Sequence, residues 1–369
     1  MWGPPPARRS AAVVRHSVVP NGGLALDELG SSRLASAAMT WVRPRPCGAP
    51  PRHLGLARLS SLRGVVATAA TRWVDGGWGY RVTSRDQLLR TISRISILRR
   101  GRIYAWRGQR DGAWELSSAL YRLLKRTGSV DEARMRAAEG ELVREARKYG
   151  LGRELGISNT DANLLATLQH HGVPTRLIDV TSNPMTALWF ATQQPRSGRQ
   201  TSGVLFAIDV TDMPWAETFK HESTTWDAAK RPLAAGYRQL IEQSAAAARP
   251  FRLFPALPDE RMTAQEGFFI GSAAPTAPRI DAVPDLDLDV NAPPGADALT
   301  RLAEGPERGP GRPFALPFLA LVIPPKVKNA MRDPLKGTYN RRRRVLFPDV
   351  DGFRDAFEHG EVELEPHGR

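Results

Sequence analysis

The chain has 369 residues, of which 41% are hydrophobic, enough to bury a substantial core in one or two domains. Its single cysteine, Cys47, excludes an internal disulfide and any zinc site built on paired cysteines, and it favours a reducing, cytoplasmic location. No apolar run approaches the roughly 20 residues of a membrane-spanning helix, so we expect no membrane association.

The formal net charge of +14 is typical of nucleic-acid-binding proteins, but its distribution weakens that interpretation. Only seven of the 52 basic residues are lysines, a bias that GC-rich coding produces without selection for phosphate binding. Residues 1–70 hold nine arginines and two acids, so half of the net charge lies there. This region is rich in Pro, Arg and Ser and lacks sustained periodicity, and we predict a disordered tail over residues 1–72.

Order is expected to begin near Trp73. Ser84 and Gln87 form a capping box ahead of a periodic apolar run, which predicts a helix over 85–98. The other elements predicted before residue 160 are a strand over 102–108 and helices over 117–125 and 131–149.

Residues 164–191 carry the densest set of local signals. A helix is expected to end at Gly172, which suits the positive φ of a helix C-terminus, and a short strand follows over 175–180. Asn183 and Pro184 then begin a second helix, with the asparagine as N-cap and the proline at the first helical position. Because the polar residues of this unit gather at its turns and strand end, we expect a site there.

From residue 192 onward, the sequence predicts more strands than helices. They are expected over 203–210, 251–257, 261–270 (after a turn) and 314–323, with helices over 232–247 and around 353–357. Residues 274–312 are rich in Pro, Gly and Asp, which predicts a disordered insertion. Strands and helices alternate irregularly, so we predict an α+β fold, a mixed sheet flanked by helices, with mixed α/β as the alternative.

Several familiar catalytic motifs are missing from the sequence. There is no G-x-S-x-G elbow, no G-x-G-x-x-G loop and no P-loop lysine. His170 and His171 are neighbours on a predicted helix, where adjacent side chains point about 100° apart. Because no third ligand stands at a suitable spacing, we predict no metal site.

Charged residues at strand ends are the remaining candidates for a functional site. Arg107 offers a guanidinium fork suited to a carboxylate or phosphate, or else to an internal ion pair with Asp179. Glu266 is either a cleft-edge acid or a solvated turn residue. The run Arg341–Arg344 is either a solvated face or a nucleic-acid patch.

Taken together, these motifs resemble the FRG domain family, which is named after an aromatic-Arg-Gly motif. The corresponding segments here are Trp106–Gln109, Gln169–Asp179, Thr181–Ala191, Arg261–Phe269 and Leu346–Asp349. The resemblance implies an FRG core over 80–210. It also implies that the same fold continues through 211–273 and is completed by a C-terminal strand and helix within 313–362.

A second, weaker resemblance is to Arg-Ser-Glu-type ADP-ribosyltransferases, which implies a fold of that kind and NAD as a substrate. Glu266 matches the later catalytic glutamate, with Gln265 beside it as the alternative, and either would polarise the ribose. The residues that the resemblance assigns to ligand binding are Arg107, Gly108, His171, Arg176, Asp179, Thr181, Ser182 and Asn183.

Three functions therefore stay open. The first is an NAD- or nucleotide-binding protein, possessing transferase or NAD-cleaving activity. The second is a non-catalytic module that binds a protein partner, in which the same residues form a structural polar network. The third is association with nucleic acid through basic surface.

Overall fold

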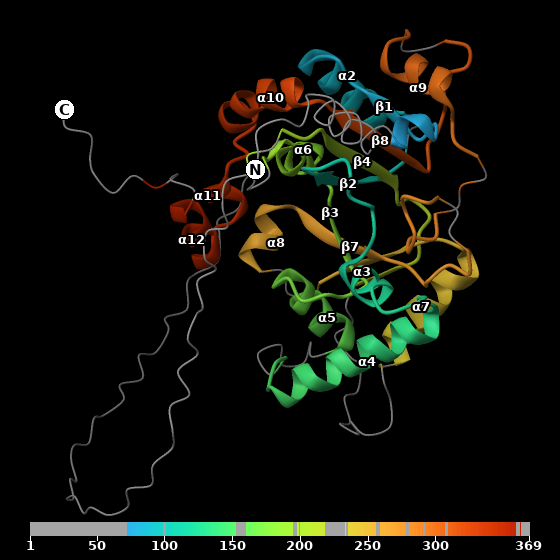
Figure 1. Ribbon diagram of the computed structural model, residues 1–369, viewed down its shortest axis with the longest axis vertical. Coiled ribbons are helices and arrows are strands. Elements are labelled where there is room, and N and C mark those ends of the chain that lie inside the picture. Colours follow the sequence, from blue (N-terminus) through green and yellow to red (C-terminus); the bar gives the residue numbers. More distant parts are fainter. Residues whose placement is uncertain are drawn as a thin grey trace, which may run out of the picture. The chain divides into compact units, whose positions relative to one another are not determined.

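The structure is a computed structural model (Figure 1). It describes residues 72–98, 101–152, 160–194, 198, 200–217, 233, 235–255, 259–277, 280–288, 290, 292–306, 309–358 and 362. All of them belong to one compact unit. Residues 1–71, which include all but the last residue of the predicted tail, lie outside the described residues.

One mixed sheet lies at the centre of the fold, with the strand order β1-β8-β4-β2-β3-β7-β6-β5. The strands are β1 (Gly79–Arg81), β2 (Tyr104–Gln109), β3 (Ile178–Thr181), β4 (Gly203–Asp209), β5 (Trp215–Glu217), β6 (Phe251–Phe254), β7 (Gly267–Gly271) and β8 (Phe318–Ile323). The β1–β8 and β5–β6 pairs are parallel and the other neighbours are antiparallel. The predicted α+β class with a mixed sheet is confirmed.

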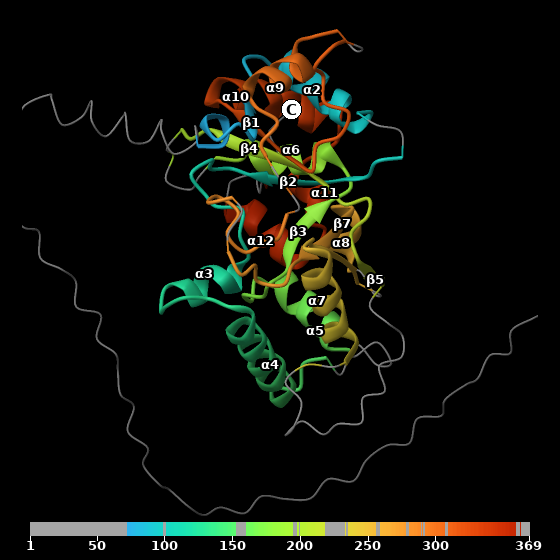
Figure 2. The same cartoon turned by 90° about the vertical axis from the view of Figure 1, so that its right-hand side faces the viewer.

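Helices cover both ends of this sheet. They are α2 (Arg85–Ser96), α3 (Ala119–Lys125), α4 (Glu132–Lys148), α5 (Asp161–His170), α6 (Pro184–Thr192), α7 (Ala235–Ala247), α8 (Glu260–Ala264), α9 (Ala296–Ala303), α10 (Pro325–Gly337), α11 (Arg343–Leu346) and α12 (Val350–Glu358). In Figure 2, α2, α9 and α10 gather near β1 and β4, and α4, α5 and α7 gather at the opposite end. No described helix is long and apolar enough to cross a bilayer.

Local capping signals place several of these helices as the sequence predicts. Ser84 Oγ accepts a hydrogen bond from the Gln87 N–H at 3.1 Å, which begins α2. Asn183 Oδ1 accepts from the Met185 N–H at 2.9 Å, which begins α6. Gly172, just after α5, has a φ of 81°. Each of these three predictions is confirmed.

The sheet consists of two halves that meet at a narrow junction. Strands β2 and β3 share a single residue pair, Trp106 with Thr181. By contrast, β2 pairs with β4 over six positions and β3 with β7 over four. This junction, which we call the fork, brings the predicted site residues of β2 and β3 next to each other.

The described part of residues 274–312 is not the disordered insertion that its composition predicts. Ile280, Val283, Leu286 and Leu288 are buried in a core formed with the sheet. The Leu116 N–H donates to the Ala282 carbonyl at 2.9 Å. Further along, α9 packs two buried leucines against α2 and its neighbours. The prediction was wrong because these apolar residues follow no regular period, so their burial depends on contacts distant in sequence.

Helix α10 was not predicted. Its segment contains Pro324, Pro325 and Pro334, which read as breakers when the sequence stands alone. Pro325 instead occupies the first turn, where the missing N–H costs nothing. The helix buries Val327, Met331 and neighbouring apolar residues against the sheet, and this burial outweighs the internal proline.

Candidate functional site

Arg107 lies on β2 beside the fork. Its Nη1 donates a hydrogen bond to the Asp179 carbonyl oxygen and lies 3.7 Å from Asp179 Oδ2. Burial lowers the pKa of the guanidinium, and the nearby Asp179 charge acts in the opposite direction. The predicted contact between Arg107 and Asp179 is therefore present, in the form of an internal ion pair.

Gly108 brings helix α6 close to the sheet. A Cβ atom at this position would lie 1.8 Å from the Ala187 carbonyl oxygen and 2.7 Å from the Ala191 nitrogen. Both atoms belong to the backbone of α6, so they cannot turn away. The glycine of the aromatic-Arg-Gly motif thus serves packing, and it holds the first turn of α6 at the fork.

Asp179 is also the end of a short hydrogen-bonded chain. Gln169 Nε2 donates to Asp179 Oδ2 at 2.9 Å, and Thr175 Oγ1 donates to Gln169 Oε1 at 2.8 Å. Half of the Asp179 side chain remains exposed, whereas that of Arg107 is 24% exposed. The carboxylate is therefore held in place but open to solvent.

The end of β3 contacts the turn before β7. Thr181 Oγ1 donates to the Gln265 carbonyl at 2.7 Å, and the Ser182 N–H donates to the Glu266 carbonyl at 3.1 Å. Asn183 Nδ2 donates to Glu266 Oε1 at 2.9 Å. These contacts bring together residues that are more than eighty positions apart in the sequence.

Glu266 occupies a turn of unusual backbone geometry. Its φ of 51° lies in the left-handed region, which is uncommon for a residue other than glycine. Its carboxylate also accepts from Arg341 Nη2 at 2.8 Å, and 43% of the side chain is exposed. The acid is thus oriented by Asn183 and Arg341 while one side stays open to solvent.

Gln265 points away from this acid. Its Nε2 donates to the Leu346 carbonyl at 2.9 Å, so its side chain anchors α11. The other basic residues of the run 341–344 are partly engaged as well: Arg343 is 13% exposed, lies 3.5 Å from Asp355 and sits over the Trp189 ring. Arg342 Nε donates to Asn340 Oδ1 at 3.1 Å, whereas Arg344 is exposed.

Arg176 does not belong to the site, contrary to the prediction. Its side chain is 1% exposed, and its Nε donates to Glu139 Oε2 at 2.6 Å. Its Nη1 lies 3.1 Å from Glu132 Oε2 and donates to the Ser272 carbonyl at 3.0 Å. Arg176 is therefore the centre of a buried network of ion pairs with Glu132 and Glu139. The sequence does not predict this role, because the two glutamates lie about forty residues earlier in the chain.

The two histidines differ in their surroundings. His171 is exposed. His170, which was not among the predicted ligand-binding residues, has a side chain that is 9% exposed, and its Nε2 lies 2.9 Å from Asp259 Oδ2. Burial lowers the pKa of His170. The described residues contain no group of three or more His, Cys, Asp or Glu that could hold a metal ion.

Three adjacent strands, β2, β3 and β7, thus present Arg107, Thr181–Asn183 and Glu266 in spatial order at the fork of an α+β sheet. Residues 102–200 match the FRG domain, so this is an FRG domain-containing protein. The match confirms the resemblance and is narrower than the predicted core of 80–210. No curated protein and no solved structure matched the chain.

Proposed function

We propose that the fork binds NAD or a related nucleotide in the manner of an ADP-ribosyltransferase. The observation that carries this proposal is the strand order β2-β3-β7. It makes neighbours of the strands that carry Arg107 and Thr181 and of the turn that carries Glu266, the same order of residue types that the weaker resemblance implies. Nothing local in the sequence requires these three segments to be neighbours.

Arg107 is the phosphate ligand in this proposal. Its partner Asp179 is half-exposed, and an ion pair of that kind contributes only about 0–1 kcal/mol. A phosphate group forms shorter, charge-assisted hydrogen bonds with the guanidinium group of Arg107, so it can replace the Asp179 carboxylate as its partner. Gln169 keeps Asp179 in place after the exchange.

Glu266 is the catalytic carboxylate in this proposal. In transfer or cleavage, the bond between ribose C1′ and the nicotinamide nitrogen breaks and nicotinamide leaves with the electron pair. An acceptor nucleophile then bonds to C1′ and loses its proton. The carboxylate stabilises the positive charge that develops on the ribose, and Asn183 and Arg341 hold it in position.

A non-catalytic module is the second candidate, and one observation favours it. Both charged groups of the site already have partners within the chain, Arg107 with Asp179 and Glu266 with Arg341. In that case the residues form a polar network that holds β2, β3 and the turn before β7 together. NAD would then have no effect on stability.

Thermal unfolding of the full chain with and without NAD tests the proposal. We expect NAD to raise the Tm, since a ligand at one hundred times its Kd stabilises a protein by about 2.7 kcal/mol. Arg107→Ala should abolish the shift. Arg102→Ala, which removes a 2.6 Å ion pair with Asp209 at the other end of β2, should lower the Tm but keep the shift.

Two results would contradict the proposal. The absence of any shift in the wild-type chain would favour the non-catalytic module. A shift that survives Arg107→Ala would show that NAD binds elsewhere.

A further inference from the structure

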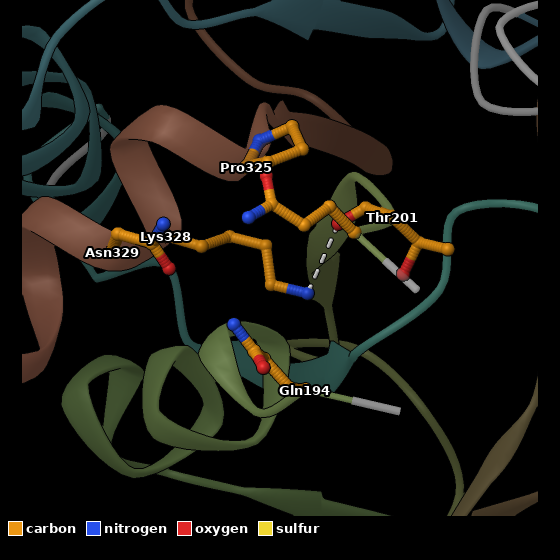
Figure 3. Close-up of a pocket in the computed structure, with 6 residues that line it drawn as sticks. Gln194, Thr201, Pro325, Lys328 and Asn329 are labelled. Atoms are coloured by element: carbon orange, nitrogen blue, oxygen red, sulfur yellow. Dashed lines mark hydrogen bonds between the residues drawn. The ribbon is translucent and has the colours of Figure 1, made fainter. Parts of the chain in front are cut away.

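Lys328 is a buried cation whose hydrogen bonds go to backbone carbonyls and not to a carboxylate. It extends from α10 into the gap between the end of β2 and the start of β4 (Figure 3). Its Nζ donates to the Arg110 carbonyl at 2.9 Å and to the Thr201 carbonyl at 3.2 Å. The residue is 2% exposed. An ammonium has three N–H donors, so one remains beyond these two bonds.

That remaining donor borders a small hollow. The hollow is open to solvent, its enclosed part has room for about one water molecule, and it is lined by Gln194, Gln200, Thr201, Pro325, Lys328 and Asn329. Three of these side chains are primary amides, which are hydrogen-bond donors as well as acceptors. In Figure 3 the amide end of Gln194 points toward the Lys328 side chain.

The charges around Lys328 are unbalanced. Burial lowers its pKa to about 8, with Arg332 and Arg110 adding to the effect and Asp111 opposing it. Within the described residues, none of these three cations forms an ion pair. Arg110 Nε is buried without a hydrogen-bond partner. A buried ammonium among like charges is costly, and a bound anion removes that cost.

The two hydrogen bonds from Lys328 to loop carbonyls hold the loops together, but this structural role does not explain why a positive charge is buried here. An uncharged amide side chain could donate to both carbonyls without burying a positive charge. Holding two loops together also requires neither an excess of cations nor an open hollow lined by amide donors. Both are what an oxyanion site requires.

We propose that this hollow binds a small oxyanion, a phosphate or carboxylate group, with Lys328 as its principal ligand. One oxygen of the anion enters the hollow and accepts the third N–H of Lys328 Nζ, and the amides around its mouth donate to the remaining oxygens. Arg110 and Arg332 supply long-range attraction. Because the hollow opens to solvent, the anion can be free or can be the end of a larger molecule. The proposal does not depend on the function proposed for the fork.

The reactivity of the Lys328 amine provides the test. The full chain is treated with trace acetic anhydride over a range of pH, in inorganic phosphate or in chloride of equal ionic strength, and each lysine is quantified by mass spectrometry. Phosphate should raise the pKa of Lys328 by about one unit, which lowers its acetylation about fivefold at pH 8 and up to about tenfold at lower pH. Lys326, exposed on the same helix, should not respond.

Variants give an independent readout. Phosphate should raise the Tm of Arg107→Ala, which lacks the phosphate ligand proposed at the fork, and of Arg107→Ala/Lys326→Gln, but not that of Arg107→Ala/Lys328→Gln. Replacing phosphate by acetate distinguishes a preference for phosphate from one for carboxylate. If Lys328→Gln does not fold, the labelling of the wild-type chain decides. Equal labelling of Lys328 in phosphate and chloride, or a phosphate shift that persists in Arg107→Ala/Lys328→Gln, would overturn the proposal.

Discussion

Individual residues at the fork are under two different kinds of constraint. Gly108 is fixed by space, because a side chain would overlap the backbone of α6. Arg107 and Glu266 are fixed by charge, because each holds a partner from a distant segment. The first constraint is structural whatever the protein binds. The second becomes functional only if a ligand competes for the same groups.

The packing constraint gives a prediction at the scale of one residue. Gly108→Ala should destabilise the protein by about 3 kcal/mol, because the added methyl forces α6 away from β2. Urea unfolding measures this. Gly337→Ala is the matched control, since a Cβ there would contact nothing within 4 Å, and its effect should stay within about 0.5 kcal/mol. Equal stability of the two variants would mean that α6 does not pack as described.

At the scale of elements, the segment 280–290 closes one face of the sheet and carries a buried acid. Asp285 Oδ2 accepts from the Ser118 N–H at 2.8 Å, and burial raises the pKa of Asp285 from 3.8 to about 6. The folded state therefore holds this proton more tightly than the unfolded state. The resulting stability is fully present below pH 3.8 and is lost as the pH rises through about 6.

Asp285→Asn should remove this pH dependence. The amide keeps an acceptor for the Ser118 N–H and carries no charge, so above pH 6 the variant should be more stable than the wild type by about 3 kcal/mol. Below pH 4 the difference should vanish. Urea unfolding across this range provides the measurement, with Asp281→Asn, exposed in the same segment, as control. Parallel profiles for wild type and Asp285→Asn would contradict the placement of this segment.

Individual helices and strands also differ in whether the local sequence predicts them. Helix α6 could be predicted because Asn183 and Pro184 define its start locally. Segment 280–290 and helix α10 could not, because their order comes from burial against distant strands. The same holds for the site. The contact of Arg107 with Asp179 was predictable from two motifs, whereas the burial of Arg176 depends on α4, which no local signal connects to it.

At the scale of the whole molecule, the FRG match is not a structural unit by itself. Residues 102–200 supply β2 and β3, whose main pairing partners are β4 and β7. Glu266 and Arg341 also lie outside the match. The sheet requires the chain at least as far as β8, and the proposed site requires it at least as far as Arg341. Experiments on the site should use the full chain.

Amide hydrogen exchange of the full chain, with and without NAD, tests the central claim most directly. Binding at the fork should slow exchange together in three segments that are distant in sequence, 105–109, 179–183 and 264–268, because one ligand contacts all three strands. Arg107→Ala should remove the protection from all of them at once. Protection confined to other segments, or no protection at any NAD concentration, would contradict the account.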